Sequence, residues 1–169
     1  MLILQEINII KYNINMLDIE DFKKKLDKKS RLMGIDPGKK RIGIAVSDEN
    51  KIIATAYTTL IKIDYSKFIS EIKTIIKEND IKGIIVGNPI NLDGTNSISS
   101  QSAKDLAINL SKDVTENITM WDERLSSQGA FNLSRNLDIN TSKKVKKLDE
   151  NAAQFILQGA LDYLSKKKA

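Results

Sequence analysis

The sequence predicts a mixed α/β fold in which helices cover both faces of a single sheet. Three features favour it: strands joined by short turns early in the chain, an alternation of helices and strands after them, and a final helix with a regular apolar stripe. The 169 residues suffice for one domain with a buried core and a short added terminal segment.

Three strands open the predicted domain. Residues 32–36 predict a strand, Pro37-Gly38-Lys39-Lys40 a turn, and residues 41–47 a second strand. Proline presets φ and glycine accepts positive φ, so this pair is suited to reversing the chain. Residues 52–63 are rich in Ile, Thr, Ala and Tyr and predict a third strand. Short turns between the three strands indicate an antiparallel meander.

The rest of the chain alternates between helices and strands. Apolar residues at helical spacing predict four helices, at residues 68–76, 103–110, 126–136 and about 149–166. Short apolar runs predict the fourth and fifth strands, at residues 83–87 and 118–121, and a polar loop covers residues 88–100. The expected order is therefore β-β-β-α-β-α-β-α-α.

We expect residues 1–30 to form an N-terminal extension and residues 31–169 to form the domain. A short peripheral helix is predicted in the extension, with acids early and lysines late as the helix dipole favours. Its apolar residues at helical spacing are Ile19, Phe22 and Leu26. Residues 1–15 show no clear period, and two interpretations stay open: a flexible extension, or a segment upstream of the true start at Met16.

The chain contains no Cys and no His. Their absence excludes disulfides, thiolate zinc sites, cysteine nucleophiles, Ser-His-Asp triads and His-ligated metals. A metal site would consist of carboxylates, carbonyls and water, which suit Mg²⁺, Mn²⁺ or Ca²⁺.

The net charge of +5 and the pI of about 9.2 favour a polyanionic partner, although lysine-rich surfaces also serve solubility. No apolar run approaches the roughly 20 residues of a membrane span. The first residues also lack a secretory pattern. We therefore expect a soluble cytoplasmic protein with no membrane partner.

Acidic residues lie at three ends of predicted elements, where open α/β sheets place ligand sites. Asp36 ends the first strand, Asp122 and Glu123 end the fifth, and Asp149 opens the last helix. Each also has a structural interpretation, as a turn cap, a solvated loop acid or a helix N-cap. Carboxylates from separate elements can hold two metal ions that support phosphodiester hydrolysis without a histidine. The convergence of such residues favours a metal site.

Residues 33–48, Met-Gly-Ile-Asp-Pro-Gly-Lys-Lys-Arg-Ile-Gly-Ile-Ala-Val-Ser-Asp, resemble the opening motif of the YqgF (RuvX) family. These are ribonuclease-H-like proteins related to Holliday-junction resolvases. Further segments resemble the family's other motifs, in the family's order: residues 86–94, 122–127 and 149–158. The resemblance covers about Leu32 to Leu164 and implies a ribonuclease-H-like fold with a mixed five-stranded sheet.

The resemblance also implies a metal-dependent nuclease that processes the 5′ end of pre-16S rRNA during ribosome biogenesis. Its catalytic acids and metal ligands would be Asp36, Glu123 and Asp149, with Asp122 as a further ligand. The expected cofactor is Mg²⁺ or Mn²⁺ in a two-metal arrangement. The expected partners are RNA in ribosomal precursors or branched DNA, with the protein a monomer or a homodimer.

Basic residues near the predicted acids are candidates for nucleic-acid contacts. They are Lys39, Lys40, Arg41, Arg124, Lys143, Lys144, Lys146 and Lys147. The arginines can bind phosphate oxygens bidentately or pair with the acids, and the lysine run can guide a nucleic-acid backbone or form a solvated loop. Two residues depart from the family pattern, Lys39 in place of Thr and Asn88 in place of Leu, and neither removes a carboxylate.

Three alternatives stay open beside the pre-rRNA nuclease. A Holliday-junction resolvase would use the same chemistry on branched DNA, usually as a symmetric dimer. A non-catalytic RNA-binding factor for ribosome assembly would retain an unused metal site. Sugar kinases and actin-like ATPases share a strand–Asp–x–Gly–turn motif, but they need a second such domain and a much longer chain.

Overall fold

Strands of both orientations form one sheet at the centre of the protein. The computed structural model describes residues 15–91, 93–125 and 142–166, and for residues 142–150 it describes the backbone alone. The described strands are β1 (Met16–Leu17), β2 (Arg31–Pro37), β3 (Arg41–Ser47), β4 (Ala54–Ile61), β5 (Ile81–Asn88) and β6 (Asn117–Asp122). Their order across the sheet is β1-β6-β5-β2-β3-β4.

The strand orientations confirm the expected mixed sheet. β2, β3 and β4 pair in antiparallel fashion, as a meander does. β5 pairs parallel with β2, and β6 pairs parallel with β5, so these later strands follow crossover connections. The carboxyl ends of β2, β5 and β6 therefore lie at the same end of the sheet.

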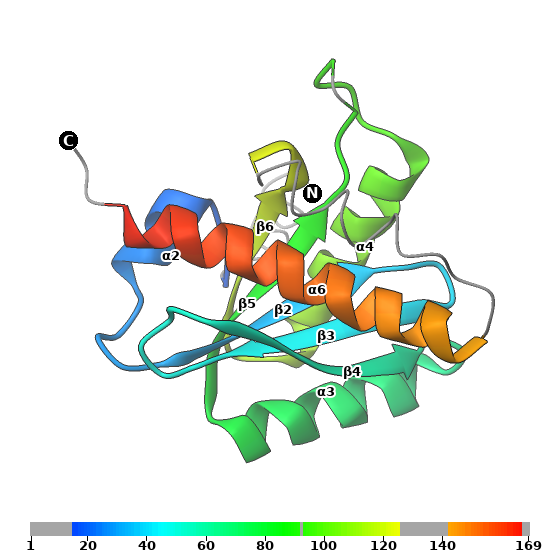
Figure 1. Ribbon diagram of the computed structural model, residues 1–169, viewed down its shortest axis with the longest axis horizontal. Helices are drawn as coiled ribbons and strands as arrows, with labels where there is room; N and C mark the ends of the chain where they lie inside the picture. Colours follow the sequence, from blue (N-terminus) through cyan, green and yellow to red (C-terminus); the bar gives the residue numbers. More distant parts are fainter. Residues whose placement is uncertain (1–14, 92, 126–141, 167–169) are drawn as a thin grey trace, which may run out of the picture.

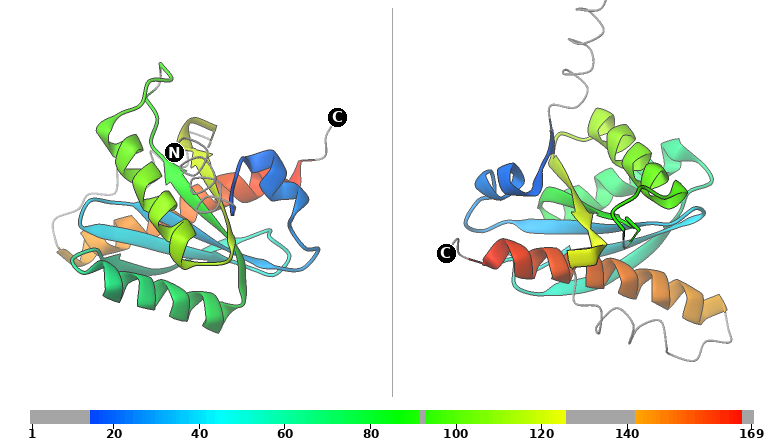
Figure 2. Two further views of the ribbon diagram at one scale, coloured as in Figure 1. Left: turned by 180° about the vertical axis from the view of Figure 1, so that it is seen from behind. Right: turned by 90° about the horizontal axis from the view of Figure 1, so that it is seen from above.

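Helices cover both faces, as the sequence predicts. Figures 1 and 2 show α3 (Tyr65–Asn79) and α4 (Ile98–Asp113) on one face, and α6 (Ser142–Ser165) across the other. The short helix α2 (Ile19–Lys24) lies near the carboxyl-terminal end of α6, and a 3₁₀ turn, η1 (Glu123–Leu125), follows β6. In the described part of the chain, no helix is long and apolar enough to cross a membrane.

Polar side chains cap the starts of these helices. Asp64 accepts a hydrogen bond from the backbone N–H of Ser66 (2.9 Å) at α3, and Ser97 accepts one from Ser100 (3.0 Å) at α4. Both satisfy backbone donors that have no partner within the helix. Such local bonds explain why helices that the sequence predicts only from their apolar residues begin a few residues earlier.

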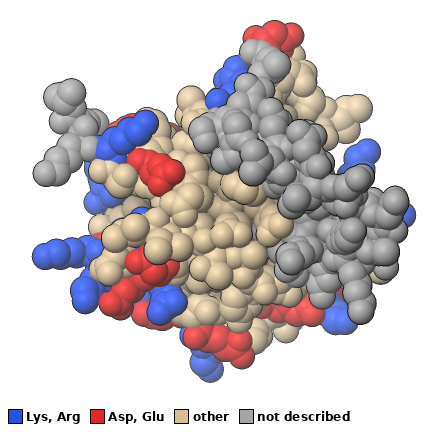
Figure 3. Space-filling view, viewed as in Figure 1, with Lys and Arg blue, Asp and Glu red and all other residues tan. Residues whose placement is uncertain are grey.

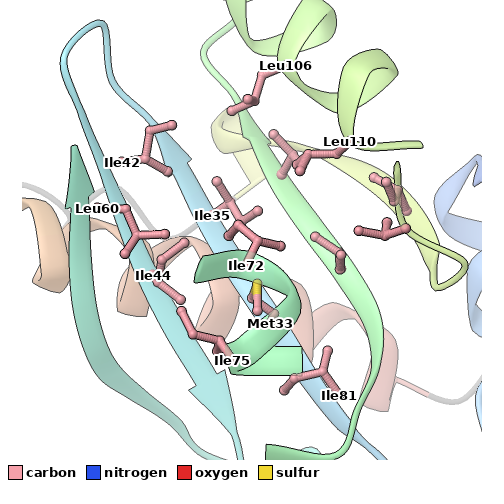
Figure 4. Close-up of a cluster of buried hydrophobic side chains, with 14 of the residues drawn as sticks. Met33, Ile35, Ile42, Ile44, Leu60, Ile72, Ile75, Ile81, Leu106 and Leu110 are labelled. Atoms are coloured by element: carbon pink, nitrogen blue, oxygen red, sulfur yellow. The ribbon is translucent and has the colours of Figure 1, made fainter. Parts of the chain in front are cut away.

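Two apolar layers enclose the sheet. The α3/α4 layer, part of which Figure 4 shows, includes Met33, Ile35, Ile42, Ile44, Phe68, Ile72, Ile84, Val86, Leu106 and Leu110. The α6 layer includes Phe22, Leu32, Ala45, Ile85, Trp121, Ala153, Ile156, Leu157 and Leu161. Successive residues of a strand point to opposite faces, so the two layers alternate along β2 and β5.

The sheet has six strands among the described residues, and the expectation of five was wrong. The added strand β1 pairs parallel with β6, with Met16 opposite Ile118 and Leu17 opposite Thr119. A strand of two residues is too short to give a periodic pattern. Met16–Leu17 and α2 therefore pack on the domain, while the boundary at residue 30 stays a prediction.

The last helix begins earlier than expected. α6 starts at Ser142, not near residue 149, so Asp149 lies in the third turn of the helix and is not its N-cap. The lysine run at 143–147 is helical, not a loop, because lysine, leucine and the neighbouring residues contain no helix breaker. The helix predicted at 126–136 lies outside the described residues.

The turn between β2 and β3 forms where the sequence predicts it, but its glycine has another reason to be there. Gly38 is not among the described residues with positive φ. A Cβ atom at this position would instead collide with the carbonyl oxygen of Arg41. The close approach of the two arms therefore requires glycine and keeps the turn tight beside Asp36, whose carbonyl accepts a 3.0 Å bond from the Gly38 N–H.

Replacing Phe22 by alanine tests whether α2 is part of the core. The Phe22 ring is fully buried in the α6 layer, so we expect Phe22→Ala to lower the free energy of unfolding by about 3–5 kcal/mol. Urea denaturation measures the change. Lys24→Ala, at an exposed position of the same helix, is the control and should have an effect below about 0.5 kcal/mol. Equal small effects of both substitutions would show that α2 does not pack on the domain.

Candidate active site at the carboxyl end of the sheet

The strand register brings Asp36 next to Gly87. Ile35 on β2 pairs with Val86 on β5, and both side chains lie in the α3/α4 layer. The next residues, Asp36 and Gly87, therefore face α6 on the other side of the sheet. Neighbouring strands lie about 4.8 Å apart, so Asp36 stands beside a position that carries no side chain.

The carboxylate of Glu123 lies over that position. A Cβ atom on Gly87 would stand 2.8 Å from Oε1 of Glu123 and 2.7 Å from Cδ1 of Ile156. A side chain at this point would displace the ends of Glu123 and Ile156. Asp36 and Glu123 are both half-buried. Two acids from separate elements, β2 and η1, thus approach the same part of the α6 face.

Asp122 makes a different set of contacts. Arg124 donates to its carboxylate from Nη2 (2.7 Å) and from Nε (3.0 and 3.1 Å), and the backbone N–H of Arg124 adds a bond of 3.0 Å. The bonds from the Arg124 side chain hold the pKa of Asp122 below its usual value. Asp122 follows Trp121, which is buried in the α6 layer, so its side chain starts toward the opposite face. Asp122 and Arg124 are therefore an ion pair, one of the two roles that the sequence allows for Arg124.

The position of Asp149 follows from the packing of α6 on the sheet. Ala153 and Leu157 lie directly over Gly34, and Asp149 occupies the backbone position one turn before Ala153. The views in Figures 1 and 2 agree that the amino-terminal half of α6 runs toward the turn between β2 and β3. The side chain of Asp149 lies outside what the structure describes, but its helix extends toward the end of the sheet that carries Asp36.

The donor set fits a hard divalent cation. Asp36 and Glu123 offer carboxylate oxygens, which Mg²⁺ and Mn²⁺ prefer as ligands. Among the described side chains, no group of three His, Cys, Asp or Glu residues could hold a metal ion. Asp149, the remaining acid of the predicted catalytic set, lies on the helix that packs against both Gly34 and Gly87.

Apart from Arg124, the predicted basic residues fall into two groups. Lys39, Lys40 and Arg41 are exposed on the turn that directly follows Asp36. The predicted lysines of α6, Lys143, Lys144, Lys146 and Lys147, have described backbone positions only. Figure 3, which looks onto the α6 face, shows most of the described charged side chains around the margin of that face and uncharged residues at its centre.

One basic residue near the turn is missing from the sequence prediction. The backbone N–H of Lys62 donates a 2.9 Å bond to the carbonyl of Lys40, so Lys62 lies beside the β2–β3 turn. The predicted meander contains the signal, because Arg41 opens β3 and pairs with Ile61 at the end of β4. Reading that register from the turn outward places residue 62 next to the turn.

Comparison with known proteins gives consistent matches. The model of the RuvX family, described as Holliday junction resolvase, matches residues 30–163. A protein of Pelagibacter ubique named "Putative pre-16S rRNA nuclease" is 53% identical over 150 residues, which cover 89% of this chain and 99% of that protein. A protein of Novosphingobium aromaticivorans with the same name is 39% identical over 134 residues, covering 79% and 86%. The structure of Thermus thermophilus RuvC covers 79% of this chain and 95% of its own, with 9% identity and a TM-score of 0.48.

Replacing Gly87 by alanine tests the position of Glu123. The added methyl group would stand where Glu123 and Ile156 now lie, so we expect Gly87→Ala to weaken Mn²⁺ binding by at least about 10-fold, as displaced ligands do. Isothermal titration calorimetry with Mn²⁺ measures the affinity.

Gly83→Ala is the matched control on the same strand. A Cβ atom there would meet the ring of Phe22 at 2.7 Å, far from Glu123 along β5, so it strains the packing without touching the acids. We expect it to lower stability and leave Mn²⁺ affinity within about 2-fold of wild type, a difference below about 0.4 kcal/mol. Equal Mn²⁺ affinities of the two variants would contradict the placement of Glu123 over Gly87.

Proposed function

The chain belongs to the RuvX family, and we propose that it is a metal-dependent nuclease that hydrolyses phosphodiester bonds in pre-16S rRNA. The ribonuclease-H-like fold that the sequence resemblance implies is confirmed, with the added strand β1. The main support for the proposal is that the Glu123 carboxylate lies over Gly87, the residue beside which the strand register places Asp36. The names of the two relatives support precursor rRNA as the substrate.

We assign the holding of Mg²⁺ or Mn²⁺ to Asp36, Glu123 and Asp149. Divalent ions at this place would supply activation of a water molecule and neutralisation of the charge on the leaving oxygen. Asp36 pairs with Gly43 on β3 and directly follows Ile35, which is paired on both sides, with β3 and with β5. Asp122 is the weakest candidate, since a metal would have to compete with Arg124 for its carboxylate.

The turn after Asp36 is suited to holding the substrate. Lys39, Lys40 and Arg41 are exposed there, with Lys62 beside them, and cations so placed attract the phosphates of a nucleic acid. The tight turn at Gly38 limits how far these residues can move from Asp36. We propose that they hold the nucleic-acid backbone so that one phosphate lies between the acids. The lysines of α6 would extend this contact from the other side.

A resolvase acting on branched DNA is the second candidate, favoured by the description of the matching family model. The same acids would serve both reactions. A cleavage assay with precursor rRNA and a four-way DNA junction, each with Mg²⁺ or Mn²⁺, distinguishes them. We expect cleavage of the RNA; cleavage of the junction alone would instead support the resolvase. Tight RNA binding with no cleavage of either substrate would support a non-catalytic assembly factor.

Replacing Asp36 by asparagine tests the catalytic assignment. Asparagine keeps the size of the side chain and removes its charge, so we expect Asp36→Asn to fold normally and to lose at least about 100-fold in cleavage rate, more than the loss of a residue that only supports a ligand. RNA affinity should change little because the basic turn is intact. Asp105→Asn, an exposed position on α4, is the control and should cleave at the wild-type rate. Undiminished cleavage by Asp36→Asn would refute the site.

A further inference from the structure

Two glutamines of α6 bind the backbone at the start of β4. The amide of Gln158 accepts a hydrogen bond from the N–H of Ala54 (2.8 Å) and donates to the carbonyl of Ile52 (2.9 Å). Gln154, one helical turn earlier, donates to the carbonyl of Ala54 (3.0 Å). Together these bonds form a glutamine clamp, in which side chains of a helix pair with both backbone groups of Ala54.

The clamp stands at the edge of the sheet. β4 is the last strand on its side, so the backbone groups of Ala54 that face away from β3 have no strand to pair with. Ala54 is almost fully buried, with 1% of its surface exposed, and an unpaired group there would be costly. Gln154 and Gln158 therefore take the place of a neighbouring strand at this point.

The clamp is directional, whereas the other contacts described between α6 and the sheet are mainly apolar. Ala153 and Leu157 pack over Gly34, and Ile156 packs beside Gly87. Apolar packing is not directional, so it tolerates small shifts along the helix axis better than hydrogen bonds do. The three clamp bonds fix which residue of α6 stands opposite Ala54.

The same helix carries Asp149. Gln154 follows it by five residues, which is roughly 7.5 Å along a helix axis. No described residue interrupts α6 between them, so a displacement at the clamp is transmitted to the position of Asp149. The amino-terminal half of α6 runs toward the β2–β3 turn in Figure 1, so the clamp lies on the carboxyl-terminal side of Asp149.

We propose that Gln154 and Gln158 are positioning residues for the metal site: their clamp on Ala54 sets the register of α6 on the sheet and so brings Asp149 to Asp36 and Glu123. This inference rests on the proposed function, because it takes Asp149 as a ligand. Neither glutamine touches the metal or the substrate. Their effect is on where the helix lies.

The test compares Mn²⁺ affinity with stability in the full-length protein. We expect Gln154→Leu/Gln158→Leu to raise the dissociation constant for Mn²⁺ by at least about 10-fold, as the loss of groups that orient ligands does. Hydrogen exchange of the Ala54 amide should accelerate in the same variant because its acceptor is gone. Gln158→Leu alone also removes the acceptor of the Ala54 N–H but keeps the bond from Gln154, so it gives a milder variant should the double variant fold poorly.

Two controls separate an effect of the position of α6 from an effect of lower protein stability. Gln101→Leu removes a glutamine from α4 whose amide binds only Asp105 among the described residues, and it should change neither measurement. Ile72→Val shortens a buried side chain in the α3/α4 layer and should lower the melting temperature by roughly 2–4 °C without changing Mn²⁺ affinity.

The possible outcomes distinguish the two proposals. Weaker Mn²⁺ binding in the glutamine variants, but not in Ile72→Val, supports the positioning role. Wild-type Mn²⁺ affinity in a variant whose Ala54 amide has lost its protection overturns the positioning role and leaves the proposed function intact. If the wild-type protein does not bind Mn²⁺ at all, the proposed function and the inference both fail.

Discussion

The packing of α6 across the sheet is the constraint on which the candidate site depends. Ala153 and Leu157 lie over Gly34, and Ile156 lies beside Gly87, so the helix approaches β2 and β5 where these strands carry no side chains. These contacts pack α6 against the sheet. The same helix runs toward the carboxyl end of β2. Asp36 and Glu123 stand at the margin of this packed region, half-buried and close to water. Burial thus fixes the backbones that hold the acids, while the carboxylates stay accessible.

The acids at the carboxyl end of the sheet lie in two different charge environments, one on each face. Arg124 forms an ion pair with Asp122, and its side-chain hydrogen bonds lower the pKa of that carboxyl below its usual value. Asp36 and the Glu123 carboxylate over Gly87 lie on the other face, where a divalent cation would offset the repulsion between nearby carboxylates. The basic turn at Lys39, Lys40 and Arg41 adds positive charge next to these acids. A polyanionic substrate would therefore be drawn to the side of the sheet end where Asp36 and Glu123 lie.

Much of this arrangement could be predicted from the sequence because it is local. Residues 41–47 form β3 as predicted, and Asp36 lies near the end of its strand, since short apolar runs on either side of a Pro-Gly turn determine both. The start of α6 could not be found in this way, because the lysine run suits a solvated loop and a helix equally well. The position of Glu123 depends on Gly87 and Ile156, which are distant in sequence, and the glutamine clamp depends on β4 being an edge strand. Contacts of this kind follow from the tertiary packing, not from any local pattern.

We propose that Asp36, Glu123 and Asp149 share one metal site. Anomalous X-ray diffraction from crystals grown with Mn²⁺ would locate the ion independently of any activity. The predicted result is a Mn²⁺ peak over Gly87 with oxygens of Asp36 and Glu123 at about 2.0–2.6 Å, as hard cations require, and with Asp149 completing the site. A peak elsewhere, or none between these carboxylates at saturating Mn²⁺, would contradict it.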